Sequence, residues 1–210
     1  MLQSRLQYIF AIIGLFSIYT LSAKADVVEF GEMTTGGNAC YQRPEFSSSL
    51  IQMNEESISG DLSVIPRIEE SLMIIPNSIL VKKLATEAGM KRGTCQFALP
   101  ISVDQNHRLV IRSISQSGHL NLGSNSEAVI QSEIFKSGDK GQILKLNEKS
   151  EERRVSKSFE LINEEQFLVS ECGEKFILRG NTSIILKGQA NRSTARTDEL
   201  IMAISIVECQ

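Results

Sequence analysis

The chain has 210 residues, of which 41% are hydrophobic, 22% charged and 6% aromatic, with four cysteines, no tryptophan and a formal net charge of −3. This size and apolar content predict one folded domain and exclude a disordered or fibrous protein. The absence of a basic excess excludes the charged surface that a nucleic-acid partner would need.

The first 25 residues have the pattern of a secretory signal peptide. Arg5 precedes an apolar run over residues 9–21, and Ala23 and Ala25 occupy the −3 and −1 positions of a cleavage site before Asp26. An uncleaved anchor is the alternative, but this run is shorter than the ~20 residues that a spanning helix needs. We therefore expect a leader over 1–25 and one secreted or periplasmic domain over 26–210, with no membrane span.

Most of the expected domain consists of short β-runs between turns rich in Gly, Asn, Ser and Asp. The run 199–207 alternates large and small apolar residues with a period of two, as a strand in a packed sheet does. Such spacing predicts an all-β fold, an antiparallel sandwich of jelly-roll or immunoglobulin-like Greek-key type. The expected strands cover residues 27–30, 58–65, 95–99, 108–114, 127–135, 142–146, 158–162, 175–178, 183–187 and 199–207.

Three regions do not follow the simple strand pattern. Residues 77–88 carry Leu80, Leu84 and Ala88 at helical spacing before Gly89, which predicts one short helix. Residues 68–75 are apolar but have no clear period. Residues 145–157 mix both charge signs, which favours a solvated loop or hairpin tip over a recognition patch.

The four cysteines all follow the expected cleavage site, and an exported chain favours disulfides. If the apolar runs after Cys172 and before Cys209 form neighbouring antiparallel strands, these two cysteines can form a disulfide. Cys40 and Cys95 then remain as the second pair among the three possible pairings. A zinc site is the alternative, but no Cys-x-x-Cys or Cys/His cluster has metal-ligand spacing.

Catalytic and cofactor motifs are missing from the sequence. There is no nucleophile elbow, HExxH, phosphate-binding or dinucleotide-binding motif. The two histidines, His107 and His119, each fall in an expected turn, and nothing selects either for a Ser–His–Asp triad. Paired glutamates such as Glu151-Glu152 could serve a glycosidase, but the expected domain has no Trp and one Tyr on which a sugar could stack. Asn181 and Asn191 begin glycosylation sequons.

The order of short motifs resembles a known family. A Gly-rich turn precedes Cys40, an Arg-x-x-Cys strand covers residues 92–99, a Gly-x-Leu-x-Leu strand starts at Gly118, and Cys172-Gly173 leads into a strand that contains Arg179-Gly180. This succession is similar to the secreted domain of unknown function 4360 family. The resemblance implies an exported, cysteine-bridged, all-β domain, and it brings no catalytic residue.

These observations favour a non-enzymatic binding or structural module of the cell envelope or extracellular space, whose partner is a protein or an envelope polysaccharide. One alternative is a secreted hydrolase with a His- or carboxylate-based site. Another is a secreted inhibitor or effector.

Overall fold

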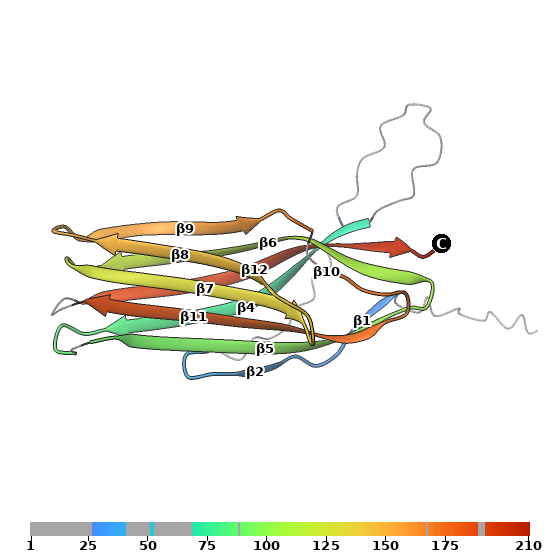
Figure 1. The fold of residues 1–210 in the computed structure, drawn as a ribbon, viewed down its shortest axis with the longest axis horizontal. Coiled ribbons are helices and arrows are strands. Elements are labelled where there is room, and N and C mark those ends of the chain that lie inside the picture. The colour runs from blue at the N-terminus through green and yellow to red at the C-terminus, as the bar shows by residue number, and fades with distance from the viewer. Residues whose placement is uncertain (1–26, 41–50, 53–68, 88, 167, 189–191) are drawn as a thin grey trace, which may run out of the picture.

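The fold is a sandwich of two six-stranded antiparallel sheets (Figure 1). The computed structural model describes residues 27–40, 51–52, 69–87, 89–166, 168–188 and 192–210, and contains no helix in these ranges. The predicted antiparallel β-sandwich is therefore confirmed.

Sheet A is built around the long strand β11. Its neighbours are β5 on one side and β7 on the other, and β8 forms the edge beyond β7. Two short strands, β1 and β2, pair with β5 at the opposite edge. The strands of sheet A are β1 (Val28–Phe30), β2 (Thr34–Gly36), β5 (Lys91–Val103), β7 (Ser126–Lys136), β8 (Gln142–Ser150) and β11 (Lys175–Gly188).

Sheet B has β12 between β6 and β4. The two-residue strand β10 and the longer strand β9 pair with different parts of β6, and β3 pairs with β4. Because β7–β8 and β3–β4 are the only described neighbours that are consecutive in the chain, most sheet contacts join distant segments. The strands of sheet B are β3 (Ile51–Gln52), β4 (Glu69–Lys83), β6 (His107–Leu122), β9 (Val155–Asn163), β10 (Leu168–Val169) and β12 (Ser193–Glu208).

The helix predicted over residues 77–88 is wrong. Residues 77–83 continue β4, which pairs with β12, and residues 84–87 form the turn to β5; Ala88 lies outside the described residues. Ile79 and Val81 are buried with a period of two, and Lys83 occupies the next inward position, where its Nζ donates to the Glu87 carbonyl at 2.6 Å. Cross-strand pairing outweighs the local helical spacing here.

Several other boundaries also differ from expectation. The runs 175–178 and 183–187 belong to one strand, β11, and residues 68–75 lie largely in β4. The mixed-charge stretch 145–157 comprises the ends of β8 and β9 and the turn between them. His119 lies inside β6 rather than in a turn. The expected strand 58–65 falls outside the described residues.

The two sheets enclose a core that is divided by a polar layer. Gln116 of β6, Ser132 of β7 and Thr182 of β11 are fully buried, and the Ser132 hydroxyl bonds with the side chains of both other residues. One hydrophobic cluster, which includes Leu99, Ile111 and Leu178, lies on one side, and a second, which includes Ile79 and Leu120, lies on the other. We call these the cystine-end cluster, which lies toward Cys172–Cys209, and the hairpin-end cluster, which contains Cys95.

The structure forms the disulfides Cys40–Cys95 and Cys172–Cys209, the two pairings expected from the sequence. The reason differs from the expected one, because the strands that follow Cys172 and precede Cys209 lie in different sheets. Cys172–Cys209 therefore links the turn before β11 to the end of β12 across the sandwich.

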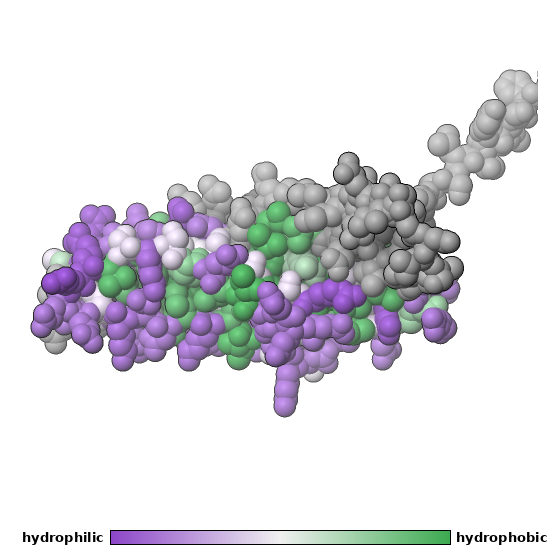
Figure 2. Space-filling model, turned by 90° about the horizontal axis from the view of Figure 1, so that it is seen from above, coloured by the Kyte–Doolittle hydropathy of each residue, from purple (hydrophilic) through white to green (hydrophobic). Residues whose placement is uncertain are grey.

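The sheets meet along one side without a backbone ladder. Figure 2 looks down on the side where β8 and β9 run, and shows hydrophobic residues between hydrophilic margins. Only side chains join these strands in the described part of the chain: Lys157 to Glu148 at 2.6 Å and Asn163 to Gln142 at 3.1 Å. Charges along both strands are typical of edges that resist pairing with another chain.

Candidate binding groove

A shallow groove of about 350 Å³ opens on the outer face of sheet A near the Cys172–Cys209 disulfide. Its volume is at the lower end of the range of about 300–1,000 Å³ typical of ligand sites. It crosses β1, β5 and β11 and is lined by Glu29, Phe30, Gly31, Pro100, Ile101, Ser102, Lys175, Phe176 and Ile177.

The groove follows from the sizes of the outward side chains on three neighbouring strands. Ser102 of β5 pairs with Glu29 of β1 on one side and with Lys175 of β11 on the other. Two residues before Ser102 on β5, Pro100 lies opposite Ile177 of β11. Because alternate residues of a strand share a face, the small side chains of β5 form a trough between the longer side chains of its neighbours.

Gly31 allows the chain after β1 to approach Pro100 closely. Its N–H donates to the Pro100 carbonyl at 2.8 Å, and a Cβ on Gly31 would lie 3.0 Å from the Pro100 Cβ. A larger residue would displace the wall of the groove from β5.

The floor of the groove belongs to the core. Ile101 is 2% exposed and Phe176 is 8% exposed, and both are part of the cystine-end cluster, against which the half-buried Phe30 also packs. The floor is therefore held by packing with sheet B, whereas Pro100 and Ile177 present apolar surface to solvent.

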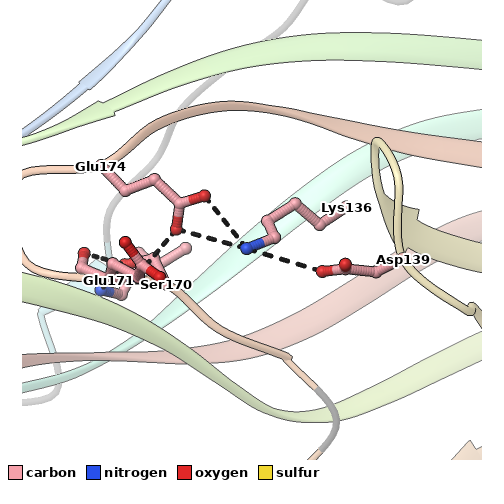
Figure 3. Close-up of polar contacts among 6 residues, drawn as sticks. Lys136, Asp139, Ser170, Glu171 and Glu174 are labelled. Carbon is pink, nitrogen blue, oxygen red and sulfur yellow. Dashed lines mark hydrogen bonds and ion pairs between the residues drawn. The ribbon is translucent and has the colours of Figure 1, made fainter.

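The turn that precedes Lys175 is held by a polar cluster around Lys136 (Figure 3). The Lys136 Nζ lies 3.0 Å and 3.4 Å from the two carboxylate oxygens of Glu174 and 3.5 Å from Asp139. Glu174 also accepts a hydrogen bond from the N–H of Glu171 at 2.7 Å. The cluster joins the end of β7, the β7–β8 turn and the β10–β11 turn.

The hydrogen bond to Glu174 raises the pKa of Lys136 above its ordinary value, and the charges of Glu174 and Asp139 act in the same direction. Partial burial of the ammonium opposes this effect, but the pKa remains raised. Lys136 is therefore a charged clamp at neutral pH, next to the wall of the groove.

Backbone hydrogen bonds and the disulfide hold the same turn from both sheets. Gly173 has a positive φ of 69°, and its N–H donates to the His107 carbonyl at 3.1 Å. The N–H of Cys209 donates to the Asn106 carbonyl at 2.8 Å, and the Val103 N–H donates to Glu174 at 3.0 Å. Lys175 thus extends from a firmly held segment.

The groove and the surface of β11 just beyond it carry charges without ion-pair partners among the described residues. Among the described residues, Lys175, Arg179 and Glu29 form no salt bridge within 4.0 Å. Lys175 and Arg179 are exposed on the same face of β11, on either side of Ile177. Arg179 lies opposite Ala98, the next small outward residue of β5.

The two candidate histidines do not come together. They lie at opposite ends of β6, twelve residues apart, which is about 40 Å in an extended strand. The ring of His119 has Ser158 Oγ and Ser156 Oγ each at 3.4 Å, and His107 Nδ1 lies 3.4 Å from Asp104. In the described structure, His119 thus has hydroxyls without a paired carboxylate, and His107 has a carboxylate without a hydroxyl bonded to its ring.

Other residues noted in the sequence are dispersed. Glu151-Glu152 and Glu164-Glu165 flank opposite ends of β9. Asn181 lies on the outer face of β11, with a buried Oδ1 that has no hydrogen-bond partner in the described structure, and Asn191 lies outside it. All four cysteines are in disulfides, so none supplies a thiolate to a metal. The expected cleavage site at Ala25 and Asp26 is also outside the described residues.

Sequence reasoning missed the groove. The signal was present in the alternation of Pro100 and Ser102 with the large residues Ile101 and Val103. The flanking walls come from β1 and β11, which are about 70 residues away on either side of β5 in the chain, so no local pattern could locate them.

The fold and its cross-links define a disulfide-bonded antiparallel β-sandwich domain, and its described part contains no helix that could span a membrane. The sequence profile of the family DUF4360, a domain of unknown function, matches residues 75–207. The chain belongs to this family. The matched region includes β5 and β11, whereas β1 precedes it.

No curated protein matches the chain in sequence. Among solved structures, TmCBM61 in complex with β-1,4-galactotriose is similar over 68% of this chain and 88% of its own, with 8% identity and a TM-score of 0.23. A family 11 carbohydrate-binding module from Clostridium thermocellum in complex with a β-1,3-1,4-mixed-linked tetrasaccharide is similar over 70% and 92%, with 10% identity and a TM-score of 0.21. At these TM-scores neither structure supports an inference about the ligand of this chain.

Proposed function

We propose that this protein is an exported binding module whose groove on sheet A holds a segment of a polysaccharide. In this proposal residues 1–25 are a leader removed before Asp26, and residues 26–210 form one domain that acts in the cell envelope or outside the cell. The groove is the observation that carries the proposal. The two disulfides are compatible with an oxidising compartment.

The chemistry of the groove favours a sugar chain over other polymers. Pro100 and Ile177 offer apolar surface to the C–H face of a sugar ring, and Ser102 and the flanking charges offer hydrogen bonds to its hydroxyls. An extended peptide that binds by strand addition needs a free strand edge. The backbone of β5, which runs along the middle of the groove, is already paired with β1 and β11.

A nucleic-acid strand fits the groove less well. Single-stranded nucleic acids stack their bases on exposed aromatic side chains within a basic channel. The aromatic residues of the groove, Phe30 and Phe176, are half-buried and buried, and Glu29 forms part of one wall.

The test compares two hydroxyl-to-aromatic substitutions on the same sheet face. Ser102→Phe fills the groove between Glu29 and Lys175, whereas Ser183→Phe places the same ring on β11 outside the groove. Retention of the protein with residues 26–210 on neutral and acidic polysaccharides is measured by affinity electrophoresis. We expect binding by wild type and Ser183→Phe and loss of binding by Ser102→Phe.

Two results would contradict the proposal. Unchanged binding by Ser102→Phe would place the site elsewhere, and failure of the wild type to bind any polysaccharide would remove the function itself. Export is tested separately, by N-terminal sequencing of the protein recovered outside the cytoplasm, which should begin at Asp26.

A further inference from the structure

We infer that the polysaccharide held by the groove is acidic, with carboxylate groups that bind Lys175 and Arg179. The inference rests on the proposed function and adds the charge class of the ligand. It is drawn from the arrangement of charges on β11.

Lys175 lines the groove, and Arg179 lies just beyond its lining residues on the same face of β11. We call these two residues the cationic wall. They are four positions apart on one strand, so their Cα atoms are about 13 Å apart on the same face. Ile177 lies between them and is 36% exposed. The wall therefore presents cation, apolar surface and cation in sequence, a pattern that suits a chain of rings with regularly spaced anionic groups.

The position of these cations beside the groove supports a ligand role. Elsewhere on sheet A, Lys187 lies 3.5 Å from Glu127, and Lys136 is bound by Glu174 and Asp139. Lys175 and Arg179 have no such carboxylate within the described structure. Lys145 and Lys149 of β8 also have no ion pair among the described residues, but they lie away from the groove. A guanidinium can hold a carboxylate through two parallel hydrogen bonds, which makes Arg179 the stronger of the two contacts.

Glu29 on the opposite wall gives the ligand an orientation. It lies across Ser102 from Lys175, two strand spacings or about 10 Å away. A carboxylate on the ligand is repelled by Glu29 and attracted to Lys175, so the acidic edge of the sugar chain should follow β11 and its neutral edge should follow β1. Removal of the Glu29 charge should therefore strengthen binding.

The experiment uses one polymer in two charge states. Oligogalacturonate carries a carboxylate on every ring, and its methyl ester has the same backbone without the charge. Affinities of the protein with residues 26–210 are measured by isothermal titration calorimetry at low and moderate salt. We expect oligogalacturonate to bind at least about tenfold more tightly than the ester, with a difference that shrinks as salt increases.

Substitutions test whether Lys175 and Arg179 cause the preference for the charged polymer. Lys175→Ala/Arg179→Ala should lose about tenfold or more in affinity for oligogalacturonate, Arg179→Lys should be intermediate, and Glu29→Gln should gain a few fold. The matched control is Lys145→Ala/Lys149→Ala, which removes two exposed cations from β8 on the same sheet face. We expect the control to bind like wild type.

Each contrary outcome has a distinct meaning. Equal binding of the ester and the acid, or equal losses of affinity in the β11 and β8 variants, would overturn the inference that the ligand is acidic. The proposed function would still stand in that case if Ser102→Phe abolished binding. Lack of binding to both polymers and to every neutral polysaccharide would overturn both. Preferential binding of single-stranded DNA in place of oligogalacturonate would also overturn the inference.

Discussion

The two ends of the sandwich are stabilised in different ways. At the hairpin end, short turns connect β4 to β5, β6 to β7 and β8 to β9, each crossing between the sheets, and the Cys40–Cys95 disulfide and the buried Lys83 lie at this end. At the cystine end, Cys172–Cys209 and the Glu174–Lys136 ion pair both hold the turn before β11. Each end therefore has one disulfide, and the groove lies at the end where a disulfide and an ion pair hold the same turn.

The largest expected effect comes from the disulfides. Their sequence separations of 55 and 37 residues each correspond to about 4 kcal/mol in the chain-entropy model. Cys40→Ala/Cys95→Ala and Cys172→Ala/Cys209→Ala should therefore lower the free energy of unfolding by similar amounts, as measured by denaturant titration.

The two disulfide variants should differ in binding. Only Cys172→Ala/Cys209→Ala frees the turn before Lys175, so only this variant should lose affinity for polysaccharide under conditions where both are folded. Equal binding losses would show that the groove responds to global stability rather than to the local clamp.

Gly180 tests the packing at the boundary between the two clusters. A Cβ at this position would lie 2.0 Å from the Phe97 ring, so Gly180→Ala should lower the free energy of unfolding by about 1–3 kcal/mol. Gly36→Ala is the control, because no heavy atom lies within 4 Å of its added Cβ. Thermal unfolding measures both variants, and equal shifts in Tm would contradict the packing described for Gly180.

Lys136→Met removes the clamp at the cystine end. Its side chain is 17% exposed and that of Glu174 is 21% exposed, so we expect a loss of about 1–2 kcal/mol at neutral pH. Because the folded pKa of Lys136 is raised, this contribution is complete below the unfolded pKa of about 10.4 and is lost as pH rises through the folded value. Urea unfolding at pH 8 and above pH 11 should show the difference between wild type and variant disappear in alkali; a constant difference would contradict it.

Glu87→Gln should have the smallest effect on the free energy of unfolding, and its pH dependence should be opposite to that of Lys136→Met. The Leu84 N–H and Lys91 lower the pKa of this exposed carboxyl at the hairpin end. Its contribution is therefore present above the unfolded pKa of about 4.3 and is lost as pH falls through the folded value. Wild type and Glu87→Gln should therefore converge in stability in acid, as followed by thermal unfolding, and a difference that stays constant down to low pH would contradict this contribution.

Sequence periodicity predicted the sandwich because most strands bury one face. In β12, Leu200, Met202 and Ile204 are buried as the alternation indicates. In β4 the same reasoning failed, since an inward lysine, Lys83, interrupts the period of two and leaves the apolar residues at helical spacing. Long-range pairing with β12 decides the conformation of this segment, and local spacing does not contain that information.

The position of the groove was harder to predict from the sequence than the positions of the strands. The small outward residues of β5 can be recognised in the sequence, but a trough also needs longer side chains on the two adjacent strands. The register that places Lys175 and Glu29 beside Ser102 is set by the whole sheet. The histidines attracted attention because of their chemistry, yet β6 holds them at opposite ends of the molecule.

The central claim is that the groove beside Ser102 is the binding site. A nuclear magnetic resonance titration of the ¹⁵N-labelled protein with oligogalacturonate tests it most directly. The account predicts that the largest amide shifts fall on Ser102, Lys175 and Ile177, with small changes on the outer face of sheet B. Shifts centred on sheet B or on the β8–β9 side, or no shifts at saturating concentration, would contradict it.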